Sequence, residues 1–342
     1  MGESQLIVQK ESLKLMLLNA ENFFIFMDKY KNQDLEKMSE SEWQSLSSAS
    51  TSNKNLRKIW KIAELILEEN PDILCLNEIG GLESLVNFNK YFLKNHYSPL
   101  LLEGNSNRGI DVGYLIKNDS SIKTVQISHK NRPINFLYPH EIEKNSSRTS
   151  HYFSRDVSEL RLFNQDSGSP QLVILLTHLK SKLDLDGWDF QGKGRREAEL
   201  KTLVKIYNEI QSELKNKVPI LIAGDFNGIA HKANFESEFK EIYDQTDLVE
   251  LFDFLNFTDE QRCTQVQFSR DGSRHLLQLD YFFTSTSALN LIISEQCGVH
   301  RYKDQMNQEL PLSRSLDERQ QLPSDHFPLI LTIKNPLKNK KG

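Results

Sequence analysis

The sequence predicts a layered α/β fold, and three observations lead to this prediction. Several apolar runs, such as LVILLT at residues 172–177, have the length of a strand and no polar alternation, which is typical of strands buried on both faces. Stretches with apolar residues at helical spacing lie between some of these runs. The order helix, proline, apolar strand occurs twice, over residues 56–77 and 197–225. This alternation favours sheets covered by helices over a helix bundle or an all-β barrel.

The first expected elements are a strand at residues 13–18 and a helix that begins near residue 56. Asn53 or Asn55 can cap this helix, and Asn70-Pro71 ends it because proline cannot continue a helix. Between the strand and the helix, residues 31–53 are polar and rich in serine, which predicts a flexible insertion.

The remaining elements follow from the same patterns. Further strands are expected at residues 72–77, 112–117, 122–127, 157–163, 172–177, 218–224, 277–284 and 328–333. Further helices are expected at residues 81–94, 197–215 and 246–255. Because no internal repeat or long linker interrupts this order, we expect a single domain over residues 1–342, with a core at about 13–333 and a frayed tail at 335–342.

Composition limits the possible functions. The 342 residues carry a net charge of −5, which argues against a broad basic surface for nucleic acid but permits a local patch. Cys75, Cys263 and Cys297 are too few and too widely spaced for a disulfide framework, which fits a reducing compartment. The first residues resemble neither a signal peptide nor a membrane helix. We therefore expect a soluble, cytoplasmic monomer with no membrane partner.

Polar side chains stand at the ends of three apolar runs, namely Asn19, Glu78 and His178. Such runs are expected to deliver reactive groups to one rim of a sheet. Glu78 is a natural oxygen ligand for Mg²⁺, with a helix-capping or surface role as the alternative. Glu21, two residues after Asn19, can supply a second carboxylate to the same ion.

Two further motifs add acid–base groups. In GDFNG, Asp225 and Asn227 lie two residues apart and share one side of an extended segment; the first can activate water and the second can bond a phosphate, with a plain turn as the alternative. In SDHF, a neighbouring carboxylate can make His326 cationic. Asp280 is the expected partner, because the adjacent Asp325 points the other way, towards metal or solvent; a satisfied structural His–Asp pair is the alternative.

Other polar residues near these motifs are candidates for binding phosphate. Each is more often a solvated surface charge, and the arginine and aspartate of RGID can instead pair with each other. The candidates are Lys180, Ser181, Arg108, Asp111, Arg155, Arg195 and Arg196.

Taken in order, these motifs resemble the endonuclease/exonuclease/phosphatase superfamily, the metal-dependent phosphoesterases that include pancreatic deoxyribonuclease and the abasic-site endonucleases. The resemblance extends over residues 13–333. Each motif alone is weak, but seven in the family's order are specific, and NAENFF and RGIDVG are most similar to bacterial nuclease-like members. The motifs are LLNAEN, PDILCLNE, RGIDVGYL, THLKS, GDFN, LDYFFTS and SDHFPL.

The resemblance implies a four-layer α/β/β/α sandwich of two mixed sheets flanked by helices, with the site at one rim of the sheets. It implies that Glu78 is the principal ligand of Mg²⁺, with Mn²⁺ as a substitute, that Asn19 lies beside it, and that Asp325 lies near metal or water. The implied reaction is in-line hydrolysis of a P–O bond.

The resemblance also implies the remaining roles. Asp225 would position or activate the attacking water. Asn227 and His178 would bind the scissile phosphate, and Asp280 would orient His326.

Two positions depart from the family's pattern. Asn77 stands where many members have glutamine before the metal-binding glutamate, which changes the contacts around the ligand. No residue clearly matches the tyrosine that some nucleases place against the phosphate, and Tyr114 is the one candidate.

Nucleic acid, DNA rather than RNA, is the leading substrate hypothesis. The alternative is a small phosphoester such as an inositol phosphate, a nucleotide or a lipid head group, because one fold hosts many substrates. A catalytically inactive binding protein is disfavoured, since every expected catalytic residue is present.

Overall fold

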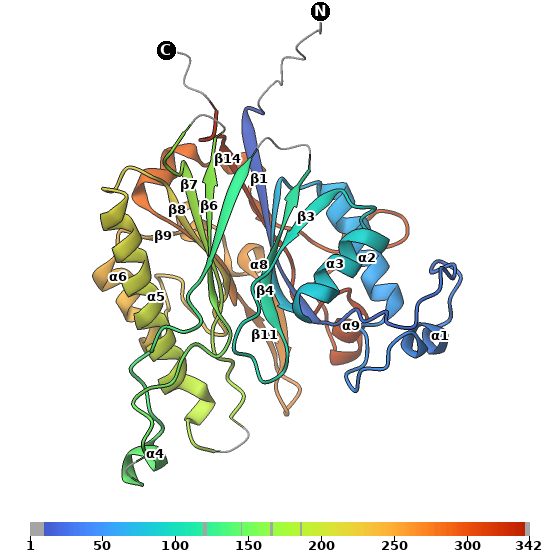
Figure 1. Cartoon of the computed structure of the whole chain (residues 1–342), viewed down its shortest axis with the longest axis horizontal. Coiled ribbons are helices and arrows are strands. Elements are labelled where there is room, and N and C mark those ends of the chain that lie inside the picture. The colour runs from blue at the N-terminus through green and yellow to red at the C-terminus, as the bar shows by residue number, and fades with distance from the viewer. Residues whose placement is uncertain (1–9, 119–121, 145, 165–166, 185–186, 339–342) are drawn as a thin grey trace, which may run out of the picture.

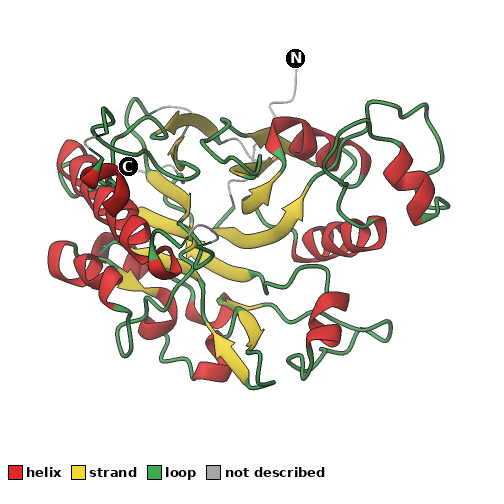
Figure 2. Ribbon diagram, turned by 90° about the horizontal axis from the view of Figure 1, so that it is seen from below, coloured by secondary structure: helices red, strands yellow, loops and turns green. Residues whose placement is uncertain are grey.

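The computed structural model describes residues 10–118, 122–144, 146–164, 167–184 and 187–338. Two six-stranded mixed sheets pack face to face, and helices cover the outer face of each sheet (Figure 1). The result is the expected four-layer α/β/β/α sandwich. Figure 2 shows the same layers from below, at the end of the molecule where several strands finish.

The first sheet has the strand order β13-β14-β1-β2-β4-β3. Strand β1 runs parallel to β2 and antiparallel to β14, and β4 runs antiparallel to both β2 and β3. The strands are β1 (Ser12–Phe23), β2 (Ile73–Ile79), β3 (Tyr97–Leu100), β4 (Asp111–Lys117), β13 (Gly298–Val299) and β14 (Leu329–Lys334).

The second sheet has the order β5-β6-β7-β8-β12-β9, and β10 and β11 form a separate hairpin. Strands β7 and β8 run parallel, and β12 runs antiparallel to β8. The strands are β5 (Lys123–Ser128), β6 (Val157–Phe163), β7 (Leu172–His178), β8 (Ile220–Asp225), β9 (Val249–Glu250) and β12 (Asp280–Thr284), and the hairpin is β10 (Gln265–Phe268) and β11 (Arg274–Leu277).

Helices α1 (Glu40–Ser45), α2 (Leu56–Glu69) and α3 (Gly81–Tyr91) lie on the side of the first sheet, and α5 (Lys193–Glu213) and α6 (Lys240–Gln245) lie on the second (Figure 1). The other α-helices are α4 (Pro139–Glu143), α7 (Leu251–Phe254), α8 (Asp259–Arg262) and α9 (Leu316–Gln321). Short 3₁₀ turns are η1 (Phe190–Gly192), η2 (Ser237–Phe239), η3 (Thr286–Leu291) and η4 (Ser294–Gln296). Within the described residues, no helix is both long enough and apolar enough to cross a bilayer.

The main core lies between the sheets. Along β1, Leu13, Leu15 and Leu17 point into this layer, whereas Met16 and Leu18 pack against the helices. Successive side chains of a strand face opposite sides, so an apolar run without alternation supplies both layers at once. The continuous apolar pattern of the sequence therefore follows from burial on both faces.

One rim of the sandwich collects the ends of strands from both sheets. Parallel strands β1 and β2 finish there, as do parallel strands β7 and β8. Strands β12 and β14 are antiparallel to β8 and β1, so they begin at the same rim. Residues far apart in sequence therefore meet at this rim.

The segment 31–53 differs from the expected flexible insertion. It contains α1, whose capping box joins Ser39 and Glu42, and the Trp43 side chain is fully buried. The Trp43 indole donates to the Lys54 carbonyl at 2.8 Å. Burial of Trp43, together with Leu35 and Leu46, thus orders a segment whose composition is otherwise polar.

Two expected elements are divided. Residues 246–255 form β9 and α7 instead of one helix, because Val249 and Glu250 pair with the edge of β12. Residues 277–284 are broken after β11, where the backbone N–H groups of Leu279 and Asp280 donate to the Thr264 hydroxyl. Tertiary pairing overrides the local pattern in both places.

The tail expected to fray is partly packed. The Asn335 N–H donates to the Glu11 carbonyl at 2.9 Å, and Leu337 is buried against the core between the sheets. Residues 339–342 of that tail, like residues 1–9 at the other end, lie outside the described part of the chain.

Candidate active site

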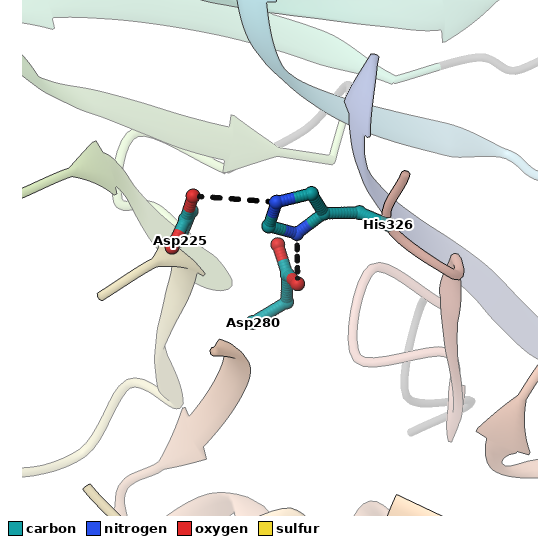
Figure 3. Close-up of side chains that lie close together, drawn as sticks. All are labelled: Asp225, Asp280 and His326. Carbon is teal, nitrogen blue, oxygen red and sulfur yellow. Dashed lines mark hydrogen bonds and ion pairs between the residues drawn. The ribbon is translucent and has the colours of Figure 1, made fainter. Parts of the chain in front are cut away.

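A buried histidine–carboxylate pair lies at the rim. His326 precedes β14 and Asp280 begins β12, and the histidine Nδ1 lies 2.7 Å from the Asp280 Oδ2 (Figure 3). Burial alone would lower the pKa of His326, but the carboxylates of Asp280, Asp325 and Asp225, with Asp280 the strongest of them, together hold that pKa well above its ordinary value. The imidazole therefore carries a positive charge at neutral pH and directs Nε2 away from Asp280.

Asp225 faces this pair from the end of β8. Its Oδ2 lies 4.0 Å from the His326 Nε2 (Figure 3). The same oxygen accepts a hydrogen bond from the Asn19 amide at 2.9 Å. Its Oδ1 accepts the backbone N–H of Asn227 at 2.8 Å. Burial, together with the nearby charge of Asp280, raises the pKa of Asp225. A carboxylate with a raised pKa is suited to accept a proton from water.

Glycine is required where β8 lies beside β7. Gly224 has a φ of 150°, and a Cβ at this position would lie 1.9 Å from the Thr177 carbonyl oxygen. The close approach aligns His178 with Asp225, whose Oδ2 lies 3.6 Å from the His178 Nε2. The tight turn continues to Asn227, which has a left-handed φ of 52°.

His178 differs from His326 in its protonation state. Burial, reinforced by the nearby Arg155, holds its pKa well below the ordinary value, so the ring is neutral. Its Nδ1 has no hydrogen-bond partner among the described residues. The Asn227 amide lies nearby and donates to the Leu179 carbonyl at 3.1 Å. A neutral imidazole beside an amide can donate hydrogen bonds to a phosphate oxygen.

Glu78 lies at the end of β2 in a strained backbone. It has a left-handed φ of 64°, and Glu21 and Asn22 at the end of β1 have φ values of 51° and 48°. The Glu78 carboxylate accepts the Asn22 backbone N–H at 2.8 Å and is only partly buried. Non-glycine residues held in this region often mark functional sites.

The donor set fits a divalent cation of the Mg²⁺ class. Asp225, Asp280 and His326 each offer one atom within a cluster whose atoms all lie within 4.8 Å of one another. Asp280 Oδ1 is buried and has no hydrogen-bond partner within the described chain. Because the raised pKa of His326 keeps its imidazole protonated, the carboxylate oxygens of Asp225 and Asp280 are the atoms of this cluster that suit such an ion.

Arg155 brings a buried positive charge to the site. Its side chain donates to the Ser154 hydroxyl at 3.2 Å and to the Leu179 carbonyl at 3.4 Å, while Nε has no partner in the described structure. Burial lowers its pKa, and the carboxylates of Glu199, Glu78 and Asp225 oppose that effect. Arg155 is therefore placed to attract an anion.

Other predicted binding residues have their polar groups engaged elsewhere. The Glu21 carboxylate, expected as a second metal ligand, lies 3.1 Å from the Lys54 Nζ and 3.4 Å from the Lys58 Nζ. Asp111 is buried and accepts the Gly104 backbone N–H at 2.7 Å, a structural contact. Both carboxylates are therefore engaged by groups of the protein itself.

The remaining predicted cations are also tied to the protein. The Lys180 Nζ donates to the Ser181 and Leu183 carbonyls at 3.1 and 2.5 Å, so the side chain is hydrogen-bonded to its own loop. The Arg108 guanidinium donates to the Asn22 side chain at 2.5 Å beside Glu78, at the mouth of the site. The buried Arg196 pairs with Glu238 at 2.6 Å and is structural.

The contacts of Tyr114 do not suit the phosphate-binding role that the sequence suggested for it. It is fully buried between the sheets, and its hydroxyl donates to the Ser158 carbonyl at 2.6 Å. Asn77 also links the sheets, since its amide donates to the Thr177 carbonyl at 2.8 Å. Both residues support the sandwich behind the rim.

Gln265 is a site residue that the sequence did not indicate. Its amide lies 2.7 Å from the His326 Nε2 and 3.1 Å from the Asp325 carboxylate. Asp325 is partly exposed beside it, as expected for a residue facing away from the Asp280 contact. Nothing in the local pattern of β10 marks this glutamine, because the contact is made across 61 residues of chain.

A family model and solved structures match this fold. The model of the endonuclease/exonuclease/phosphatase family matches residues 41–326. The human Nocturnin catalytic domain, solved with a bound sulfate anion, is 18% identical, with a TM-score of 0.55 and 95% of each chain covered. No curated protein matches the chain significantly.

Two further structures have the same fold at lower identity. TDP2 of D. rerio, complexed with a single-strand DNA product, is 12% identical, with a TM-score of 0.56, 95% of this chain and 100% of that chain covered. A Bacteroides thetaiotaomicron mannosyl-6-phosphatase is also 12% identical, with a TM-score of 0.53 and coverage of 94% and 99%. Since the family model extends over most of the sequence, the chain belongs to the endonuclease/exonuclease/phosphatase family of metal-dependent enzymes that hydrolyse phosphoesters.

Proposed function

We propose that this protein is a metal-dependent phosphodiesterase that cleaves nucleic acid, with DNA preferred to RNA. The observation that carries the proposal is the buried contact of His326 with Asp280 at 2.7 Å, facing a second carboxylate, Asp225, at 4.0 Å. One cationic and one basic group on opposite sides of a small space match the needs of in-line attack by water.

The residues divide the reaction between them. Asp225 accepts a proton from the attacking water, and Asn19 holds its carboxylate in position. His178, Asn227 and Arg155 donate to the phosphate oxygens, and the cationic His326 stabilises the charge that grows on the phosphorus centre. A divalent cation held at Glu78 would neutralise charge on the phosphate and the departing oxygen.

Three observations favour a nucleic acid over a small phosphoester. Arg155 and Arg108 supply positive charge at the site although the whole chain is acidic. Two cavities of about 910 and 670 Å³ lie beside α2, and neither is lined by Asp225, Asp280 or His326, so neither would enclose a small ester at the reaction centre. The similar D. rerio TDP2 was solved with a single-strand DNA product.

A small phosphoester is the second candidate. The similar mannosyl-6-phosphatase and the net charge of −5 favour it, because an acidic protein repels a polyanion.

A substrate panel tests the proposal. Purified protein is incubated with supercoiled plasmid, single-stranded DNA, RNA and small phosphoesters, each with Mg²⁺, Mn²⁺ or EDTA, beside His326→Ala as a control. We expect metal-dependent cleavage of DNA that disappears in the variant. Release of phosphate from small esters with no cleavage of any polymer would overturn the proposal in favour of the second candidate.

A further inference from the structure

A group of stacked rings lies outside the reaction centre. Tyr138 and His140 are almost parallel, at 15° with 5.8 Å between centroids, and Trp188 lies 4.1 Å from His140 and 6.0 Å from Tyr138. We call Tyr138, His140 and Trp188 the aromatic platform. Trp188 is 51% exposed, and the nearby Phe190 is 80% exposed. Large rings at this exposure are candidates for ligand contact.

Polar contacts position the residues of the platform. Arg195 donates to the Tyr138 hydroxyl at 3.2 Å and to the Tyr152 carbonyl at 3.1 Å. The Asp184 carboxylate accepts the backbone N–H groups of Trp188 and Asp189, both at 3.1 Å. Rings that are fixed before a ligand arrives lose little entropy on binding.

A short path of contacts joins the platform to the phosphate-binding groups. The Glu199 carboxylate accepts the backbone N–H of Ser154 and of Lys180, both at 2.7 Å, and lies 3.4 Å from the Arg195 Nε. Ser154 precedes Arg155, and Lys180 follows His178 by two residues. The helix α4 lies at the lower end of the molecule, beside the start of α5 (Figure 1). The platform therefore adjoins the rim on the side of the second sheet.

A cation lies near the platform, and a second is on the helix that holds it. Arg148 lies 2.7 Å from His151, whose ring lies 5.0 Å from that of Tyr138, and 3.9 Å from the Glu141 carboxylate. Lys193 is half exposed at the start of α5 and lies 3.9 Å from the Glu238 carboxylate. Rings that offer a flat face next to cations that follow a phosphate backbone are the combination used by proteins that bind single strands. In a duplex the base faces are already stacked and cannot reach such rings.

We propose that the aromatic platform is a base-stacking subsite for a nucleotide that flanks the scissile phosphate of single-stranded nucleic acid. This inference rests on the proposed function, since it names the form of substrate that the same rim receives.

Intrinsic fluorescence reports binding directly. The three tryptophans are Trp43, Trp60 and Trp188; the first is fully buried, the second partly buried, and the third is exposed on the platform. In the cleavage-impaired Asp225→Asn background, an oligothymidine should quench tryptophan emission, and a strand of equal length and charge without bases should not. Equal quenching by both strands, or none by either, would overturn the proposal.

Steady-state cleavage gives the second test. Trp188→Ala should raise KM for single-stranded DNA about fivefold or more, as the loss of one stacked base implies, with a small change in kcat. Trp188→Phe should restore most of the loss because it keeps a ring. The control Phe254→Ala, which removes a half-exposed ring from α7, should leave KM unchanged. An unchanged KM in a folded Trp188→Ala variant would rule out the base-stacking subsite.

The two proposals fail separately. Cleavage of DNA with equal KM in wild type and Trp188→Ala would support the nuclease activity and rule out the base-stacking subsite. Base-dependent quenching without cleavage of any nucleic acid would keep the platform and overturn the nuclease.

Discussion

At the scale of single residues, one carboxylate sets the electrical state of the site. Asp280 contacts His326 directly and lies opposite Asp225 in the ladder between β12 and β8. Its charge raises the pKa of both neighbours. For Asp225 this adds to the larger effect of burial, which also raises the pKa, whereas for His326 it opposes burial, which lowers the pKa. The same charge thus keeps the histidine protonated and makes the second aspartate a stronger base.

The pH–rate profile tests this role. Activity needs Asp225 without its proton and His326 with its proton, so the profile should be bell-shaped. Asp280→Asn removes the charge that raises both pKa values, so both limbs should move to lower pH, and activity at pH 8 should fall more than activity at pH 6. The exposed Asp271→Asn serves as control. An alkaline limb that stays in place would contradict the account.

A metal titration tests Glu78. Glu78→Gln removes the charge of the proposed ligand, so the Mg²⁺ concentration for half-maximal rate should rise by at least about tenfold. The upward shift of Tm that Mg²⁺ gives to wild type should shrink in parallel, since binding to the native state stabilises it. Glu83→Gln, on the exposed face of α3, should behave as wild type. Equal Mg²⁺ dependence in both variants would exclude Glu78 as the ligand.

The sequence predicts residues of the rim well where they end apolar runs. His178 and Asp225 are the last residues of β7 and β8, and Asn19 ends the apolar run of β1, so all three meet at the rim. The end of an apolar run is a local feature of the sequence. Glu21 and Asp111 carry similar local signals, but their carboxylates are engaged by Lys54 and by the Gly104 backbone. A lysine distant in sequence and a loop amide make these contacts, so the local sequence around Glu21 and Asp111 does not predict them.

At the scale of elements, the parallel contact of β7 with β8 fixes the site. Gly224→Ala would place a methyl group 1.9 Å from the Thr177 oxygen, so the strands must separate. We expect a loss of stability above about 4 kcal/mol, or, if the variant folds, a loss of activity through displacement of Asp225. Gly298→Ala, with open space around the added methyl, is the matched control. A stable, active Gly224→Ala enzyme would contradict this reading.

The packed segment 31–53 makes a second prediction at this scale. Trp43→Ala should reduce the free energy of unfolding by about 3–5 kcal/mol, because it empties a fully buried site. Ser41→Ala on the exposed side of α1 should have little effect. Urea denaturation measures both changes. A loss below about 1 kcal/mol for Trp43→Ala would mean that the segment is the flexible insertion that its composition suggests.

At the scale of the whole molecule, the four-layer sandwich could be predicted because its motifs keep the family's order along the chain. The pairing between sheets could not be read from local pattern. Tyr114 reaches from β4 to the Ser158 carbonyl, and Asn77 reaches from β2 to the Thr177 carbonyl. Both contacts depend on two sheets assembling across 44 and 100 residues of chain. Gln265 enters the site by the same kind of long-range contact.

Asp225 is the proposed base in the reaction of a metal-dependent phosphodiesterase. The most direct measurement is the rate of Mg²⁺-supported cleavage of a fluorescent single-stranded DNA by wild type and by the isosteric Asp225→Asn, with matching circular dichroism spectra for the two proteins. We predict that the variant loses activity by about 10²–10⁴-fold and that EDTA abolishes cleavage by wild type. A folded Asp225→Asn that cleaves within a few fold of wild type would contradict the account.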